Sequence, residues 1–278
     1  MNGLMKERDK AAVCLLCGST KWRLLAELRV KPRWETDFGI PADSYYREIL
    51  RCEICGVCIS QHDMLPTDVY SQQYNKATYH NDLEKQFLRI MNLPEEKSDN
   101  KQRVARVLAF VNDHMGKQDR LKVLDVGSGL CVFLAEMKKH EFYCECLDPD
   151  PRATEHALAN ANVDKAVTCS FDGYQTDIVF DLITFNKVLE HVTNPVHMLN
   201  HARAFLGRKG VVYVELPDSE GALVNGSINE REEFYVEHHV IFDIRSTERL
   251  AASAGYSVLS IKQMHEPSDK YTVSAFLE

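Results

Sequence analysis

The sequence predicts an α/β fold in which a doubly wound parallel sheet follows a small cysteine-rich module. From about residue 104 onward, apolar stretches of strand length alternate with stretches of helical periodicity, which is the pattern of repeated strand–helix units. Two Cys-x-x-Cys pairs precede this region, and a glycine follows each pair. We therefore divide the chain into a module at 1–75, a linking segment at 76–115 and a parallel-sheet domain at 116–278.

The composition is that of a globular protein. With 278 residues, of which 45% are hydrophobic and 27% charged, the chain can bury a full core. No uninterrupted apolar stretch approaches the roughly 20 residues that span a bilayer, and the start is polar rather than signal-like. We expect a cytoplasmic protein with no membrane span. The net charge of -8 and the lack of a dense Lys/Arg run disfavour a nucleic-acid partner.

The cysteine pairs predict a structural zinc site. A two-residue spacing lets both thiolates of a turn point at one ion, and the glycine supplies the open backbone that the turn needs. Two such turns complete a tetrahedral site with the ligands Cys14, Cys17, Cys52 and Cys55. A redox or disulfide arrangement is the disfavoured alternative, because a cytoplasmic protein keeps its thiols reduced.

Aromatic residues between the cysteine pairs, Trp34 and Tyr45 among them, are interpreted as packing within the module. The linking segment begins with a polar, tyrosine-rich stretch at 70–80 that includes Tyr79 and is a candidate lid. A turn is expected at 92–100. Apolar residues at helical spacing over 104–111 then predict a helix that leads into the sheet domain.

A strand, a glycine turn and an amphipathic helix are predicted over 121–137. Asp125, Gly127 and Gly129 lie at the turn, where glycines let a ligand approach the backbone and the helix start offers free amides. The third glycine of a dinucleotide fingerprint would fall at position 132, which is Val132. The turn is therefore typical of a nucleotide-type site, but NAD and FAD are disfavoured.

The second strand, at 142–147, is followed by Asp148. Its carboxylate can accept hydrogen bonds from both hydroxyls of a ribose. A helix is expected at 151–160, because Pro151 suits a first helical turn. The structural alternatives are that Asp125 is an ordinary strand-end residue and that Asp148 is a helix cap, in competition with Asp150.

The remaining elements continue the alternation. Strands are expected near 166 and at 178–185, 211–216, 257–262 and 272–277, and helices at 195–206 and 245–254. In a parallel sheet, ligands bind beyond the carboxyl ends of the strands. Asn186 and Pro217 follow strands at that edge, as do Asp125, Gly127 and Asp148.

At this point the sequence resembles a known family. Leu-Asp125-Val-Gly127-Ser-Gly129 is similar to the first motif of class I S-adenosylmethionine methyltransferases, and residues 180–192 resemble their fourth-strand motif. The two final strands fit the closing hairpin of that family. The resemblance covers about residues 100–278 and implies a Rossmann-like seven-stranded sheet. Cys131 departs from the small residue that many members carry, and we expect it to be tolerated.

The resemblance also implies which residues bind S-adenosylmethionine. The glycine turn would line its methionine and ribose parts, and Asp148 would bind the ribose. The turn of Ser170, Phe171 and Asp172 would hold the adenine, and Asn186 joins the cofactor-binding set. Glu190 and His191 either border the sulfonium or form a structural pair, and neither is assigned a catalytic role.

Residues 233–240 are the densest candidate for the acceptor side. His238 is a candidate general base, oriented by Glu237 or Tyr235. In a regular strand His238 would face away from Tyr235 and Glu237, so the pairing requires a loop or bulge. His239 is then the rival base. The structural alternative is that both histidines are ordinary surface or hydrogen-bonded residues.

A narrower resemblance links the zinc module, the tyrosines and Tyr235-x-Glu237-His238 to the sugar methyltransferases of deoxysugar and surface-polysaccharide pathways. It implies that Tyr235, Glu237, His238 and, from the tyrosine segment, Tyr79 form the active site, with Tyr74 a rival for the fourth place. The sequence ends without the further carboxy-terminal domain of the nucleotide-sugar C-methyltransferases. O-methylation is therefore as plausible as C-methylation.

The leading interpretation is an enzyme that transfers a methyl group from S-adenosylmethionine to a sugar, a sugar nucleotide or a related small polar metabolite. An RNA methyltransferase is the second interpretation. The acidic charge and the lack of an Asn-Pro-Pro-Tyr signature count against it. A third interpretation is a methyltransferase-like scaffold without turnover, and the intact glycine turn and Asp148 count against that.

Overall fold

The cysteine pairs belong to a module built on an antiparallel sheet. The computed structural model describes residues 13–64, 82–116 and 120–278. The module sheet has the order β1 (Trp22–Leu28), β2 (Arg47–Cys52), β3 (Cys58–Gln61) and β9 (Val240–Ile241), and a short 3-10 helix, η1 (Ala42–Ser44), precedes β2. Cys58 pairs with Ile241 and Ile59 with Val240. A strand from far along the chain therefore completes the sheet, which the cysteine pattern does not predict.

The second sheet has seven strands and confirms the predicted α/β class. Its strands are β4 (Lys122–Val126), β5 (Tyr143–Asp148), β6 (Lys165–Thr168), β7 (Phe180–Asn186), β8 (Leu206–Pro217), β10 (Val258–His265) and β11 (Tyr271–Leu277). Their order is β10-β11-β8-β7-β4-β5-β6. The five strands from β4 to β8 are parallel, and β11 runs antiparallel to both of its neighbours, β8 and β10.

Helices connect the parallel strands. The α-helices are α2 (Leu83–Met91), α3 (Asp99–Met115), α4 (Val132–Met137), α5 (Pro151–Asn160), α6 (Pro195–His201), α7 (Ser219–Val224) and α8 (Ile244–Ser253). The 3-10 helices are η3 (Glu95–Lys97), η4 (Lys138–His140), η5 (Phe171–Gly173), η6 (Leu189–His191), η7 (Ala202–Phe205) and η8 (Glu232–Phe234). The expected helix at 195–206 is wrong at its end, because Leu206 pairs with Phe180 and begins β8.

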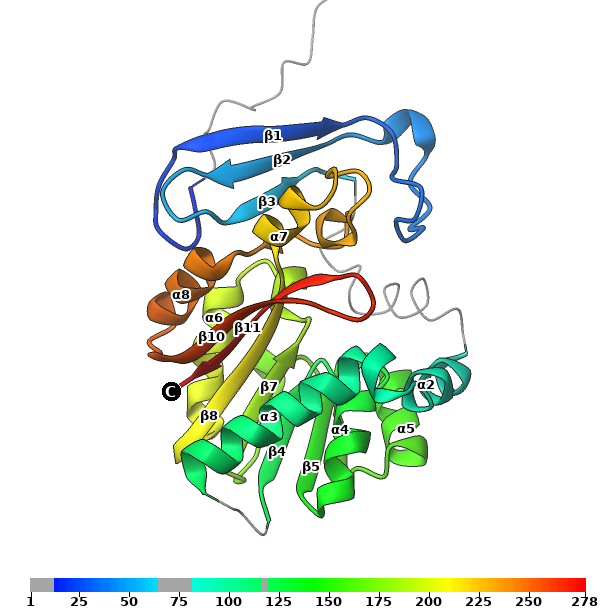
Figure 1. Ribbon diagram of the computed structural model, residues 1–278, viewed down its shortest axis with the longest axis vertical. Helices are drawn as coiled ribbons and strands as arrows, with labels where there is room; N and C mark the ends of the chain where they lie inside the picture. Colours follow the sequence, from blue (N-terminus) through cyan, green and yellow to red (C-terminus); the bar gives the residue numbers. More distant parts are fainter. Residues whose placement is uncertain (1–12, 65–81, 117–119) are drawn as a thin grey trace, which may run out of the picture.

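The two faces of the seven-stranded sheet pack against different helices. Val123 and Leu182 belong to one cluster of buried residues, which includes residues of α3, α4 and α5. Their neighbours Leu124 and Ile183 belong to another, which includes residues of α6 and α8. Helix α3 lies across the near face in Figure 1. Successive strand residues thus point to opposite faces, as in any sheet that is covered on both sides.

The module lies over the carboxyl edge of the parallel strands (Figure 1). Beyond β8, Asp218 forms a parallel bridge to Phe242, which follows β9. On the other side, the Arg249 Nε and Ser253 Oγ groups of α8 donate to the carbonyl of Leu16, at distances of 3.0 and 3.1 Å. These contacts fix the module directly above the edge where ligands bind in such sheets.

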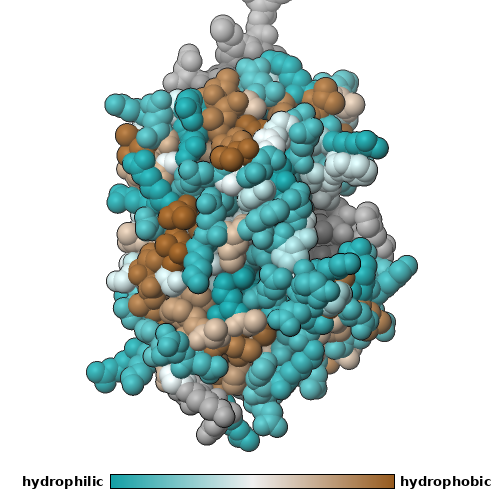
Figure 2. Space-filling view, viewed as in Figure 1, coloured by the Kyte–Doolittle hydropathy of each residue, from teal (hydrophilic) through white to brown (hydrophobic). Residues whose placement is uncertain are grey.

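Hydrophilic residues cover most of the face seen in Figure 2, and hydrophobic residues form several separate groups on it. Ten large hydrophobic side chains are exposed among the described residues, and Trp34, at 72%, is among the most exposed of them. None of the helices in the described ranges combines the length and the apolar character needed to cross a bilayer.

Candidate active site

The glycine turn after β4 has the backbone that the sequence requires of it. Gly127 and Gly129 have φ values of 69° and 50°, which favour glycine. A Cβ on Gly127 would lie 2.9 Å from Cγ2 of Val188, which follows β7. The turn therefore needs glycine both for its conformation and for the close approach of the segment after β7.

Asp125 links the glycine turn to the end of β7. Its carboxylate accepts hydrogen bonds from Thr184 Oγ1 at 2.6 Å and Asn186 Nδ2 at 2.8 Å. The Oδ1 atom of Asn186 is buried and has no hydrogen-bond partner in the described part of the chain. Burial raises the pKa of Asp125 to about 6. Asp125 and Asn186 are thus brought together at the predicted edge, with an acceptor atom still available on Asn186.

Asp148 lies beside the same turn. Its Oδ2 accepts from the amide of Gly129 at 2.9 Å, and its Oδ1 accepts from the amide of Asp150 at 2.9 Å. The cap of α5 is Asp150, which accepts from the amide of Arg152. Asp148 is therefore not the helix cap. Burial raises the pKa of Asp148 to about 6, so an added hydroxyl donor would stabilise its ionised form.

The predicted adenine turn lies at η5. Ser170 is exposed and precedes the 3-10 helix, whereas the side chain of Phe171 is only 3% exposed. Phe171 packs against Phe185 and Phe205 at ring distances of 5.8 and 5.7 Å. Its side chain serves the core, so a contact with adenine would have to come from the backbone of this turn or from its exposed neighbours.

A cavity of about 280 Å³ is lined by five parts of the chain, one of which is the end of β8 with Pro217. Trp34 and Thr36 come from the module, and the segment after β7 contributes Lys187, Glu190 and His191. Tyr235, Glu237 and His238 come from the segment after η8, and Lys270 and Tyr271 from the β10–β11 hairpin. The three described residues of the predicted acceptor site therefore share one cavity. Tyr79, the fourth, lies outside the described residues.

The segment after η8 is a turn rather than a strand. The amide of His238 donates to the carbonyl of Tyr235 at 3.0 Å. This turn lets Glu237 and His238 line the same cavity, which a regular strand would prevent. The amide of His239 donates to the carbonyl of Glu190, and its ring stacks on His62 at 6.3 Å. His239 does not line the cavity.

Two histidine rings meet in the cavity with defined tautomers. His238 Nδ1 lies 2.9 Å from the carbonyl of Glu233, and His191 Nδ1 lies 2.9 Å from the carbonyl of Glu237. A carbonyl oxygen can only accept, so in both neutral rings Nδ1 carries the proton and Nε2 the lone pair. Burial lowers the pKa of His238 well below its usual value and that of His191 to about 4. Both rings are therefore neutral at physiological pH.

Two carboxyl groups in the cavity have pKa values close to neutral pH. Burial raises the pKa of Glu237 to about 7, and the carboxylate accepts from Thr36 Oγ1 at 3.0 Å. Burial also raises the pKa of Glu190 to about 7, although the positive charge of Lys187 opposes this shift. Neither carboxyl oxygen of Glu190 has a hydrogen-bond partner among the described residues.

Glu190, His191 and His238 each offer a ligand atom within 4.8 Å of the others. The charge of Lys187 acts on all three of these groups. A fixed ammonium group so close would repel a divalent cation. We therefore interpret the cluster as groups that handle protons and hydroxyls rather than as a metal centre.

The four cysteines of the module do form a cluster that suits a metal. One sulfur atom from each of Cys14, Cys17, Cys52 and Cys55 lies within 4.8 Å of the others. The Sγ atoms of Cys14 and Cys55, and those of Cys17 and Cys52, are 3.5 Å apart. Tetrahedral zinc with Zn–S bonds of about 2.3 Å would separate its sulfur ligands by about 3.8 Å. The donor set and spacing are compatible with zinc.

Sequence reasoning did not identify the module's contribution to the cavity. Tyr45 is buried, as expected for packing, but the interpretation of Trp34 as packing is wrong, because its side chain is 72% exposed at the rim of the cavity. Thr36 was not singled out. An aromatic residue and a threonine between two cysteine pairs carry no motif, so only the folded arrangement reveals them.

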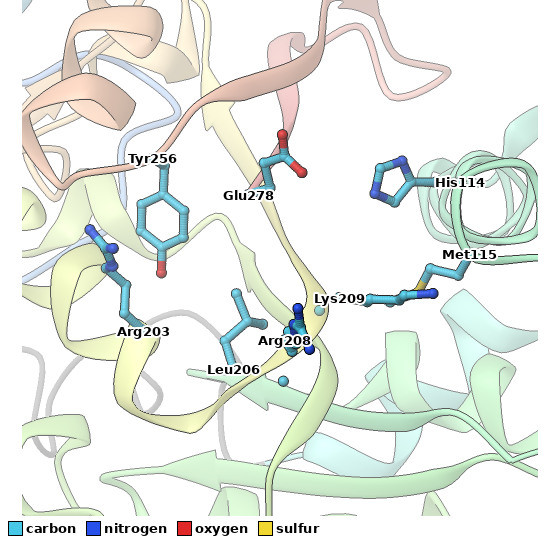
Figure 3. Close-up of a pocket in the computed structure, with 10 residues that line it drawn as sticks. His114, Met115, Arg203, Leu206, Arg208, Lys209, Tyr256 and Glu278 are labelled. Atoms are coloured by element: carbon cyan, nitrogen blue, oxygen red, sulfur yellow. The ribbon is translucent and has the colours of Figure 1, made fainter.

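A larger cavity of about 530 Å³ lies at the opposite end of the sheet (Figure 3). Arg203, Arg208, Lys209 and Tyr256 line it at the start of β8. Parallel strands begin at this end, whereas ligands in such sheets bind where they finish. The glycine turn and Asp148 lie at the other edge, and we place the candidate active site there.

Comparisons with known proteins identify the family of the chain. A family model described as a methyltransferase domain matches residues 44–261. No curated protein matches the sequence. The fold is similar to that of magnesium protoporphyrin IX methyltransferase from Synechocystis with bound S-adenosylhomocysteine, at 14% identity and a TM-score of 0.53. That match covers 72% of this chain and 95% of the other.

Two further structures are similar. The 1,6-didemethyltoxoflavin-N1-methyltransferase of Burkholderia thailandensis matches 83% of this chain and 95% of its own, at 16% identity and a TM-score of 0.52. The plantazolicin methyltransferase BpumL, in complex with a pentazolic desmethylPZN analog and S-adenosylhomocysteine, matches over 76% of this chain and 94% of its own, at 12% identity and a TM-score of 0.56. At such identities the likeness shows the fold alone.

Proposed function

The chain belongs to the methyltransferase-domain family and is an S-adenosylmethionine-dependent methyltransferase, and from this premise we propose that its acceptor is a sugar, a sugar nucleotide or a related small polar metabolite. The observation that carries the proposal is the cavity shared by Tyr235, Glu237 and His238. Its volume of about 280 Å³ suits one small ring, and its lining offers hydroxyl, carboxyl and imidazole groups.

The cofactor would lie against the glycine turn and Asp148, which are hydrogen-bonded to each other. Bound S-adenosylmethionine supplies an electrophilic methyl group on a sulfonium. The carboxylate of Asp148 would accept hydrogen bonds from the ribose hydroxyls. Asn186 Oδ1 would accept one from the amino group of the methionine part of the cofactor. Val188, whose side chain lies close to Gly127, directly follows Lys187, which lines the acceptor cavity.

On the acceptor side, His238 would act as general base. Its Nε2 lone pair can take the hydroxyl proton of the acceptor as the acceptor oxygen bonds to the methyl carbon, while the sulfur–methyl bond would break with its electron pair going to the sulfur. Glu237 would hold a second hydroxyl of the acceptor. The Arg33 guanidinium lies over one face of Trp34, 4.5 Å from the ring centroid, so a ring of the acceptor would pack on the other face of this exposed indole. Tyr79 remains part of the proposed acceptor site. Ser170 and Phe171 remain part of the proposed adenine site.

We further propose that Cys14, Cys17, Cys52 and Cys55 hold one structural zinc ion. The closed four-sulfur set leaves no position for substrate, so the ion would stabilise the module rather than take part in the reaction.

Binding and transfer experiments test the proposal in order. Calorimetric titration should give binding of S-adenosylmethionine and none of NAD. Transfer of a labelled methyl group is then measured with nucleotide sugars, free sugars and total RNA as acceptors. Label in a sugar is the expected result. Label in RNA alone would replace the proposed acceptor class with RNA. If the protein binds the cofactor but transfers no methyl group to any of a broad set of sugars, the proposed acceptor class is contradicted.

A further inference from the structure

The acceptor-side turn is held by residues of the cysteine-rich module. Arg47 and Glu35 of the module form an ion pair at 2.8 Å, and neither side chain has any exposed surface. Arg47 Nη1 donates to the carbonyl of Phe234, and Glu35 Oε2 accepts from the amide of Val236 at 2.7 Å. The pair therefore grips two backbone groups on either side of Tyr235.

The grip extends to a side chain of the cavity itself. Thr36, the residue after Glu35, donates its hydroxyl to Glu237 Oε1 at 3.0 Å. Tyr45 fixes the pair from behind, because its hydroxyl donates to Glu35 Oε1 at 2.6 Å and accepts from Arg47 Nε at 2.8 Å. The polar atoms of the pair are thus used either inside the module or on the turn.

A buried ion pair contributes little net stability, because the loss of hydration offsets the attraction between the charges. Burial raises the pKa of Glu35 even with Arg47 beside it, which agrees with a large loss of hydration. What such a pair provides is direction, since a guanidinium presents its donors in a fixed plane. A pair that directs its remaining groups at one turn acts as a template for that turn.

We infer that Glu35, Thr36 and Arg47 are positioning residues for methyl transfer, which set the conformation of the turn that carries Tyr235, Glu237 and His238. These three residues of the module then support the acceptor side of the site. This inference rests on the proposed acceptor role of the turn. It does not depend on which acceptor the turn receives.

Two substitutions test the inference. Glu35→Gln keeps a carbonyl acceptor but leaves Arg47 without its counter-charge, and Thr36→Val removes the hydroxyl at constant shape. Thr36→Ser restores the hydroxyl and serves as the rescue variant. The matched control in the same module is Glu27→Gln. Glu27 lies on β1 and forms an exposed ion pair with Arg29. Zinc content by elemental analysis reports whether the module remains folded.

The first readout needs no acceptor. Amide hydrogen exchange in the peptide spanning 234–239 should become at least about tenfold faster in Glu35→Gln, because a charge-assisted grip on the turn is lost. Exchange around β4 and the affinity for S-adenosylmethionine should not change. Normal exchange at 234–239 in a zinc-loaded Glu35→Gln protein overturns the inference, and if that variant loses zinc, normal exchange in Thr36→Val does so.

The second readout uses an acceptor that the wild-type protein methylates. In Thr36→Val, kcat should fall at least about tenfold with KM for S-adenosylmethionine unchanged, and Thr36→Ser should recover most of the rate. Equal rates in all three proteins overturn the inference. If the wild-type protein methylates no sugar, the proposed acceptor class fails, while the exchange result still decides whether the module holds the turn.

Discussion

At the scale of single residues, the site contains carboxyl groups whose pKa values burial raises toward neutral pH. Asp125, Asp148 and Glu237 are almost fully buried, and their pKa values rise to about 6, 6 and 7. A carboxylate with few donors around it costs free energy that an incoming ligand with hydroxyl or amino donors can offset. These groups therefore bind ligands in a manner that depends on pH near neutrality.

The affinity for S-adenosylmethionine should fall as the pH decreases below about 6. Asp148 becomes protonated there and loses its charge and one acceptor site, so affinity should decline by up to about tenfold per pH unit. Calorimetric titration between pH 5 and 8 measures this. Asp148→Asn should bind more weakly and lose most of the pH dependence. A wild-type affinity for the cofactor in Asp148→Asn would remove the ribose role.

The ligand-free protein should show the opposite dependence in its stability. The folded-state pKa of Asp148 lies above the unfolded value of 3.8, so folding binds a proton between about pH 4 and 6. The contribution of Asp148 to the free energy of unfolding is therefore greatest at low pH and is lost as the pH rises through about 6. Urea unfolding of wild type and Asp148→Asn at pH 5 and 7 measures the difference.

His238→Gln should keep cofactor binding but lose transfer by about a hundredfold or more, because the Nε2 lone pair is absent. The matched control is His239→Gln, whose ring lies against His62 outside the cavity. The measurement is single-turnover transfer at saturating cofactor. Equal losses in the two variants would argue for a structural effect of the segment rather than a base at His238.

At the scale of elements, short connections determine the site. The glycine turn after β4 accommodates Val188 after β7, and Asp125 at the end of β4 bonds to Asn186 at the end of β7. Neighbouring parallel strands thus present their carboxyl ends as one surface. A change in one connection should act through its neighbour.

Gly127→Ala should weaken cofactor binding and destabilise the fold by about 1–3 kcal/mol, because alanine is strained at a φ of 69° and its Cβ meets Val188. Adding Val188→Ala removes the steric part only. Unfolding by urea should therefore show partial recovery in the double variant. Full recovery would mean that backbone strain contributes nothing, and no recovery would mean that Val188 is not the neighbour that matters.

Much of this element scale was predictable because it is periodic. The strand–helix alternation identified the five parallel strands, the final hairpin strands and α5. The boundaries of α6 and β8 were not predictable, because pairing of Leu206 with Phe180 overrides helical periodicity. Long-range partners such as Arg103 and Glu215, which form a two-armed ion pair, leave no local pattern at all.

At the scale of the whole molecule, the two sheets form one continuous body. Cys14, Cys52 and Cys55 belong to the same cluster of buried residues as Val214 of β8 and Leu250 of α8. The domain boundaries expected from composition separate segments that pack together here. Three residues of the acceptor-side prediction line one cavity, but the module's share in that cavity depends on contacts between residues about 200 positions apart.

Removal of zinc should lower the thermal stability of the protein and weaken the attachment of the acceptor-side segment to the module. Chelation, or Cys55→Ser, should decrease the unfolding midpoint by about 5 °C or more and accelerate amide exchange in β3 and β9. Cofactor affinity should change little, because the glycine turn and Asp148 lie in the other sheet. Readdition of zinc should reverse the effects of chelation. An unchanged midpoint after verified metal loss would argue against a structural ion.

The pairing of β3 with β9 has a consequence for biosynthesis. During translation the module emerges first, but the strand that covers the edge of β3 follows only after most of the second sheet has been made. Until then β3 exposes unpaired backbone groups, which can pair with another nascent chain. The module sheet can therefore be completed only after Ile241 has been synthesised. Cellular yield should depend on chaperones that shield such an edge during that interval.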